Sequence, residues 1–252
     1  MFLVIVKSFI FSIISILLAF GARYFLKVDN LLVDVGGISA YVTVFGTLYG
    51  IMAAFVVFEV WNQHNNTSKL IDQEAQGLER LFRLTLYFRD TNLTKQMKET
   101  IESYAHLIIA GKFQKLGGGE RNKENGVVFR KLSGIIRDIK FDDNHDEVIF
   151  NHIVDHYGKL SETRTERINQ SLARLPKLLK AFLYIASAFA LLTFVIMPFS
   201  NLFYHAFTVG ALAFVLAMVF QLIEDLDNPF IGHFNITPEP FQRALQHIEE
   251  DY

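Results

Sequence analysis

The sequence predicts an all-α integral membrane protein with four transmembrane helices, arranged as two hairpins, and a helical cytoplasmic domain. The first observation behind this prediction is a set of four apolar stretches, Phe2–Phe25, Val35–Val60, Leu178–Phe199 and Asn201–Ile223. Each has about the 20 residues that a helix needs to cross hydrocarbon about 30 Å thick. A soluble core helix does not stay apolar on all sides over such a length.

The second observation is the distribution of charge. Nearly all Lys and Arg residues lie between Lys69 and Lys180, mixed with almost as many acids, and the net charge is −2. No basic tract indicates a nucleic-acid partner. The chain has no cysteine, which excludes disulfides, thiolate zinc sites and cysteine nucleophiles. No alternating strand pattern persists anywhere, so the charged middle is expected to be helical.

The first span, Phe2–Phe25, has the general character of a signal peptide. However, its first residues are apolar, its only early charge is Lys7, and Leu18–Gly21 is a poor match to a small-x-small cleavage site. We therefore expect it to remain as an uncleaved membrane anchor.

The positive charge predicts how the chain is oriented. Residues 62–177 carry most of the Lys and Arg, and such segments tend to stay on the cytoplasmic side. Both termini then face the cytoplasm as well, in a multi-pass protein of the inner (cytoplasmic) membrane.

Four regions follow from this layout. They are a first transmembrane hairpin (1–61), a cytoplasmic helical domain (62–175), a second transmembrane hairpin (176–223) and a cytoplasmic C-terminal tail (224–252). Within the cytoplasmic domain, spacing and capping residues predict four helices. The first covers Thr67–Asp90, and the second runs from a cap at Asn92 or Thr94 through Ile109. After a break at Leu116–Asn122, the third covers Lys123–Lys140 and the fourth runs from a cap at Asp142 or Asp143 to Arg174.

The second span has two different faces. Gly46, Gly50 and Ala54 line one side at helical spacing. Such a row of small residues lets another helix approach closely inside lipid, so we expect it to pack against a helix.

Leu48, Ile51, Phe55 and Glu59 lie on the opposite side, three or four residues apart. An ionisable group in a span is costly in lipid and usually faces an aqueous cavity or a partner. This face is therefore a candidate lining for a water-filled path. The alternative is that Glu59 lies at the headgroup boundary, beside an interfacial Trp61, with no special role.

Several motifs resemble the bestrophin family. Leu48–Phe58 resembles the pore-lining second span of bestrophin channels, and Asp227–Gly232 resembles the segment that follows their last span. The pattern as a whole, over about residues 46–85 and 164–240, is most similar to a bacterial bestrophin-like four-span family of unknown function. The further matching positions are Trp61, Asn62, Gln63, Glu74, Ala75, Arg83, Arg167, Leu175, Pro176, Asn228, Pro229, Phe230 and Gly232.

The resemblance implies a homo-oligomeric ring in which each second span faces a central pore with an apolar neck. Ile51 and Phe55 match two successive neck positions. The third falls at Glu59, where the family has an apolar ring, and a ring of carboxylates would favour cations. The acidic calcium clasp of animal bestrophins has no counterpart in Ile231–Thr237, so calcium activation is not expected.

Three further features have two interpretations each. His152 and His156, one turn apart, could hold Zn²⁺, but no third ligand is evident, so we expect solvated or intersubunit histidines and no metal or cofactor. Pro176 is expected to start the third span rather than to act as a gating hinge. The Asp227–Phe230 run stops the fourth helix and anchors an aromatic, or it couples the tail to the neck.

Arg164 and Arg167 lie about one turn apart. They pair with acids of another helix, Glu74 or Glu79 being examples, or they lie on a solvated face.

The resemblance thus implies an ion channel, with identical subunits, membrane lipid and inorganic ions as partners, whereas composition and periodicity alone indicate a four-span helical membrane protein with a cytoplasmic bundle. The alternative is a non-conducting signalling or scaffold protein that acts through its cytoplasmic helices. We do not expect an enzyme, because no catalytic triad, phosphate loop, convincing metal set or intramembrane carboxylate pair occurs.

Overall fold

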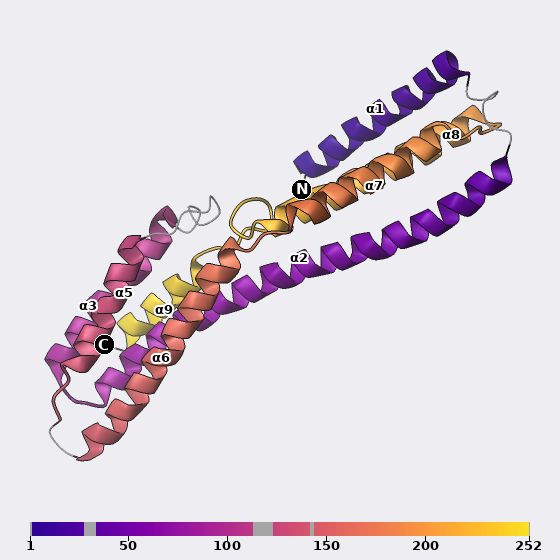
Figure 1. The fold of residues 1–252 in the computed structure, drawn as a ribbon. Coiled ribbons are helices and arrows are strands. Elements are labelled where there is room, and N and C mark those ends of the chain that lie inside the picture. Colours follow the sequence, from indigo (N-terminus) through magenta and orange to yellow (C-terminus); the bar gives the residue numbers. More distant parts are fainter. Residues whose placement is uncertain (1, 28–33, 113–122, 142–143, 252) are drawn as a thin grey trace. The chain divides into compact units, whose positions relative to one another are not determined.

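The computed structural model describes residues 2–27, 34–112, 123–141 and 144–251 (Figure 1). The predicted break at Leu116–Asn122 and the predicted caps Asp142 and Asp143 lie outside these residues. The described part of the chain is helical, without strands. Its helices are α1 (Phe2–Leu26), α2 (Val35–Leu86), α3 (Thr91–Leu107), α5 (Lys123–Arg137), α6 (Asn144–Leu172), α7 (Lys177–Val195), α8 (Leu202–Asp227) and α9 (Glu239–Glu250), with a π-helical turn η2 (Ile108–Lys112) after α3.

The chain divides into two compact units. The membrane unit comprises residues 1–62 and 174–227, and the bundle unit comprises residues 63–173 and 228–252. Four helical stretches are long and apolar enough to cross a membrane: Phe2–Leu26, Gly36–Leu86, His145–Val195, of which α7 is the apolar part, and Leu202–Asp227. The prediction of an all-α protein with four membrane spans is confirmed.

In the membrane unit, α1 packs against α8, and both lie beside α7 (Figure 1). The Ser12 hydroxyl donates to the Gly210 carbonyl (2.8 Å), and a Cβ at Gly210 would come within 2.8 Å of Ile16. The Gln221 amide donates to the Ser8 hydroxyl (2.7 Å) one turn nearer the start of α1. These small and polar residues allow the two helices to approach closely.

A polar contact joins the start of α7 to the end of α8, at the end of the hairpin opposite its turn. Pro176 precedes the first residue of α7, and its carbonyl accepts the first helical bonds, from Leu179 and Lys180. The buried Asp227 carboxylate accepts from the Leu175 N–H (2.6 Å) and pairs with the Lys180 ammonium (2.8 Å). Pro176 therefore starts the third span, as predicted.

Several helix bounds differ from the sequence prediction. The third span ends at Val195 and not at Phe199, because Pro198 cannot continue a helix and restricts the residue before it. The fourth continues to Asp227. The second span, predicted as Val35–Val60, and the helix predicted over Thr67–Asp90 form one continuous helix, α2, because Trp61–Asn66 holds neither Gly nor Pro.

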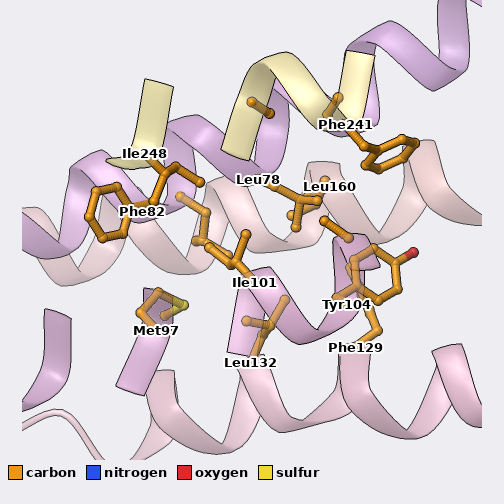
Figure 2. Packing of buried hydrophobic residues seen from close by; sticks show 14 of the residues in the cluster. Leu78, Phe82, Met97, Ile101, Tyr104, Phe129, Leu132, Leu160, Phe241 and Ile248 are labelled. Carbon is orange, nitrogen blue, oxygen red and sulfur yellow. The ribbon is translucent and has the colours of Figure 1, made fainter. Parts of the chain in front are cut away.

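The bundle unit is built around one apolar core to which five helices contribute (Figure 2). Figure 2 shows Leu78 and Phe82 of α2 on the same side of the core as Ile248 of α9, with Phe241 of α9 toward Leu160 and Tyr104. The core also contains Met97, Tyr104, Phe129, Leu132 and Leu160.

Two features of this unit correct the sequence analysis. α3 is capped by Asp90, whose carboxylate accepts from the backbone of Asn92 (2.8 Å) and Leu93 (3.1 Å), rather than by Asn92 or Thr94. α9 was missed within the predicted tail. Its signals are a start at Pro238 and apolar residues at Phe241, Ala244, Leu245 and Ile248, which follow a helical period.

Candidate functional site: the second span and its supporting contacts

One face of α2 packs against α7 and α8 of the same chain, and this packing determines which faces of the helix remain exposed. Val56 and Val60 are buried in a cluster with residues of α7 and α8. Two turns earlier, the Tyr49 hydroxyl lies 2.5 Å from the Ser187 hydroxyl of α7. Ala53, between them, packs against the same cluster. Within the membrane unit, α2 thus meets its neighbours along one stripe.

The predicted pore-lining residues lie away from that stripe. Leu48, Ile51 and Phe55 have exposed fractions of 61%, 50% and 66%, and Glu59 is exposed as well. Three large apolar side chains in a row are thus left uncovered by their own chain. Their role in a pore stays a prediction.

The small-residue row is also uncovered. Gly46, Gly50 and Ala54 are exposed, and a Cβ built at Gly46 or Gly50 meets nothing within 4 Å. No described part of this chain packs on it. The row borders an apolar groove of about 680 Å³ between α2 and α8, to which Val215 and Val219 of α8 contribute.

In the bundle unit, Arg167 of α6 and Glu74 of α2 form a buried ion pair. The Tyr104 hydroxyl donates to Glu74 (2.5 Å), and Arg164 donates to Tyr104 (3.0 Å). Burial, and secondarily the Glu74 charge, raises the pKa of Tyr104, so the hydroxyl stays protonated and can donate. Burial alone would lower the pKa of Arg167, but the interactions with Glu74 and Tyr104 together outweigh it, and the net shift of the pKa is upward.

Of the two acids named from the sequence as possible partners, Glu74 forms the ion pair with Arg167. Glu79 instead lies 2.9 Å from Arg83, one turn along α2, and 3.0 Å from His247 of α9. Tyr104 was not among the predicted residues, because an aromatic in an amphipathic helix gives no sign that its hydroxyl joins a charged pair.

The segment after α8 ends that helix and fixes the tail in the bundle unit. Phe230 is 2% exposed in the bundle core, and the Pro229 carbonyl accepts from Ile236 (2.7 Å). Gly232 has φ 118°, a conformation that side chains oppose, which explains glycine at this position. This matches the first of the two interpretations, a helix stop with an anchored aromatic.

The two histidines of α6 are not brought together. His156 is half-buried and bonded to the Gly77 carbonyl (3.0 Å), whereas His152 is exposed. Across the described ranges, no group of three potential metal ligands occurs. The Gly77 contact gives His156 a structural explanation.

A family model for the Bestrophin-like domain matches residues 9–241. The chain belongs to the bestrophin-like domain family. No curated protein matches this bestrophin-like protein in sequence.

Solved structures agree with the family. A crystal structure of a tryptophan-to-alanine variant of a bacterial bestrophin homologue from Klebsiella pneumoniae superposes with a TM-score of 0.74 at 10% identity, covering 98% of this chain and 96% of that one. A leucine-to-threonine variant of a Klebsiella pneumoniae homologue gives 0.71 at 10% identity, with 99% and 97% covered. At such identities the likeness shows a shared fold over nearly the whole chain.

Proposed function

We propose that the bestrophin-like protein is an ion channel formed by a closed ring of identical subunits, with α2 of each subunit facing a central pore. Ile51 and Phe55 form a hydrophobic neck, and Leu48 lies on the wider side before it. The observation that carries this proposal is the uncovered apolar row on α2. Large side chains in a row on a membrane helix, turned from their own chain, suit the constriction of a pore.

The small row on the same helix supports the ring. Gly46, Gly50 and Ala54 offer a flat surface on which a helix of the next subunit can pack without displacing any side chain. One face of α2 then serves its own chain, a second serves the neighbouring subunit, and the third faces the axis.

Glu59 sets the expected ion preference. Glu59 follows Phe55 on the same face of α2, about one helical turn beyond the neck. A ring of carboxylates at that level concentrates cations and repels anions, so the channel prefers cations. The positive charge of residues 62–177 supports an orientation in which this end, and both termini, lie at the cytoplasmic side of the inner membrane.

Currents across planar bilayers test conduction. Purified protein is expected to pass current. Phe55→Ala is expected to increase this current or to keep the pore open, because the substitution removes most of the side chain that forms the neck. Phe207→Ala is the matched control, since Phe207 of α8 is similarly exposed (64% against 66%) but lies on another helix. Silence of the wild type and both variants would contradict the proposal.

The alternative is a non-conducting scaffold. The bundle unit favours it, because this unit is compact by itself and has its own apolar core. A partner protein that binds through surface residues of the bundle unit, in a chain that is silent and indifferent to Phe55→Ala, would support the scaffold.

A further inference from the structure

A second groove in the membrane unit lies between α1, α7 and α8, away from the proposed pore face. It has a volume of about 970 Å³, within the range of roughly 300–1,000 Å³ that is typical of ligand sites. On α1 its lining extends from Lys7 to Phe25. At 1.5 Å per residue these positions are about 27 Å apart, close to the thickness of the hydrocarbon layer.

Polar groups occur mainly at one end of this groove. Gln221 of α8 bonds to Ser8 of α1, so Lys7 and Gln221 lie at the same level. Tyr184 of α7 stacks on Phe220, which places its ring at this end too. Beyond them the lining is apolar, with Ala188 and Leu192 of α7 facing α1 side chains. The groove thus has one polar end at a membrane boundary and a long apolar remainder.

At that end, Lys7 differs from Lys180 in having no acidic partner in the described part of the chain. Lys180, another lysine near this level, pairs with Glu224 (3.2 Å) and Asp227 (2.8 Å). The Tyr184 hydroxyl also donates to Glu224 (2.9 Å). Among the residues that the structure describes, no acidic side chain pairs with Lys7, which is exposed. An ammonium group that borders a long apolar groove is complementary to an anionic headgroup with its acyl chain.

We propose that this groove binds an anionic phospholipid, with one acyl chain between α1 and α7 and the phosphate against the Lys7 ammonium. The small residues of the α1–α8 contact hold α1 close to α8, which leaves the side toward α7 open. The inference depends on the membrane-spanning fold and not on conduction.

Native mass spectrometry of the detergent-solubilised protein tests the site, with phosphatidylglycerol and phosphatidylcholine of identical chains as probes. The wild type is expected to retain phosphatidylglycerol roughly fivefold better, the ratio that one lysine near an anionic surface provides. Lys7→Gln is expected to abolish this preference, and Lys7→Arg to keep it. Ala188→Phe, which fills the groove from an exposed position, is expected to lower retention of both lipids.

Lys177→Gln is the matched control, because Lys177 is exposed at the same end of α7 but does not line the groove. Equal retention of the two lipids by the wild type would overturn the site, as would a Lys177→Gln effect as large as that of Lys7→Gln. If Ala188→Phe dissociates the oligomer and leaves lipid retention unchanged, the groove is a contact between subunits and the proposal is wrong. Unfolding midpoints without added lipid identify any variant that fails to fold.

Discussion

Arg167 of α6 and Glu74 of α2 are joined by an ion pair with side-chain exposures of only 3% and 0%. A buried charge is costly unless a partner and hydrogen bonds satisfy it. Here Tyr104 supplies a further donor to Glu74, and Arg164 lies behind Tyr104, 4.9 Å from the centre of the Phe129 ring. The cluster joins α2, α3 and α6, so it fixes how these helices meet in the bundle unit.

Breaking this pair is expected to destabilise the bundle unit strongly. Glu74→Leu leaves the Arg167 guanidinium buried without its carboxylate, which costs roughly 3–5 kcal/mol. The double variant Glu74→Leu with Arg167→Met should recover much of the loss, because neither charge then remains. Chemical denaturation measures both effects. A single variant as stable as the surface control Glu99→Gln would show that the pair contributes little.

The close contact between α1 and α8 makes Gly210 sensitive to size. Gly210→Leu forces side-chain atoms into Ile16 and Ser12, and overpacking of this kind costs about 1–3 kcal/mol. Gly134→Leu, at a partly buried helical position with nothing within 4 Å of a Cβ, is the control. The unfolding midpoint in detergent should fall markedly only for Gly210→Leu. An equal fall in both variants would contradict the contact.

His156 predicts a pH dependence of stability. Burial lowers its pKa below the usual value, and the charges of Arg80 and Lys159 add to this, although the bond to Gly77 opposes it. Between the folded and unfolded pKa values, the unfolded chain binds more protons than the folded one. Stability is therefore complete above about pH 6.5 and declines as the pH falls below it.

Removal of the imidazole should reduce that decline. His156→Gln keeps a donor for the Gly77 carbonyl but does not titrate, so its stability should fall less between about pH 6.5 and pH 5. Unfolding midpoints of the two proteins across this range measure the difference. Parallel curves would show that His156 is not the titrating group.

The tail helix α9 should contribute substantially to the bundle unit. Phe241 is 0% exposed in the bundle core, and Phe241→Ala is expected to cost roughly 3–5 kcal/mol. Phe234→Ala, in the same tail but 46% exposed, should have little effect. Denaturation that is equally sensitive to both substitutions would argue against the observed docking of α9.

Glu59 provides the test of ion preference. Glu59→Gln keeps the size of the side chain and removes its charge. The reversal potential in asymmetric KCl should therefore shift away from the equilibrium potential of K⁺. Glu102→Gln, a change of the same kind in α3 of the bundle unit, serves as the control. An unchanged reversal potential in Glu59→Gln would show that this carboxylate does not face the conduction path.

The four spans could be predicted because length and apolarity are local properties of the sequence. The contacts between them could not, since Ser8 and Ser12 in an apolar span give no sign that they face α8. The sequence also named Glu74 and Glu79 as equal partners for the arginines. The packing of α3 and α6 on α2 distinguishes them, because it places Tyr104 and Arg167 beside Glu74.

The separation of the two rows on α2 is the part of the candidate site on which sequence and structure agree. Periodicity separates Gly50 and Ala54 from Ile51 and Phe55, and both rows are uncovered in the chain. In the proposed ring, a neighbouring subunit covers the small row and the apolar row faces the axis.

An image of the purified oligomer along the membrane normal tests the central claim most directly. Single-particle electron microscopy is expected to show a closed ring with the α2 helices innermost and with Ile51 and Phe55 at the narrowest point. A monomer, or a dimer in which the α2 helices share no axis, would contradict the channel.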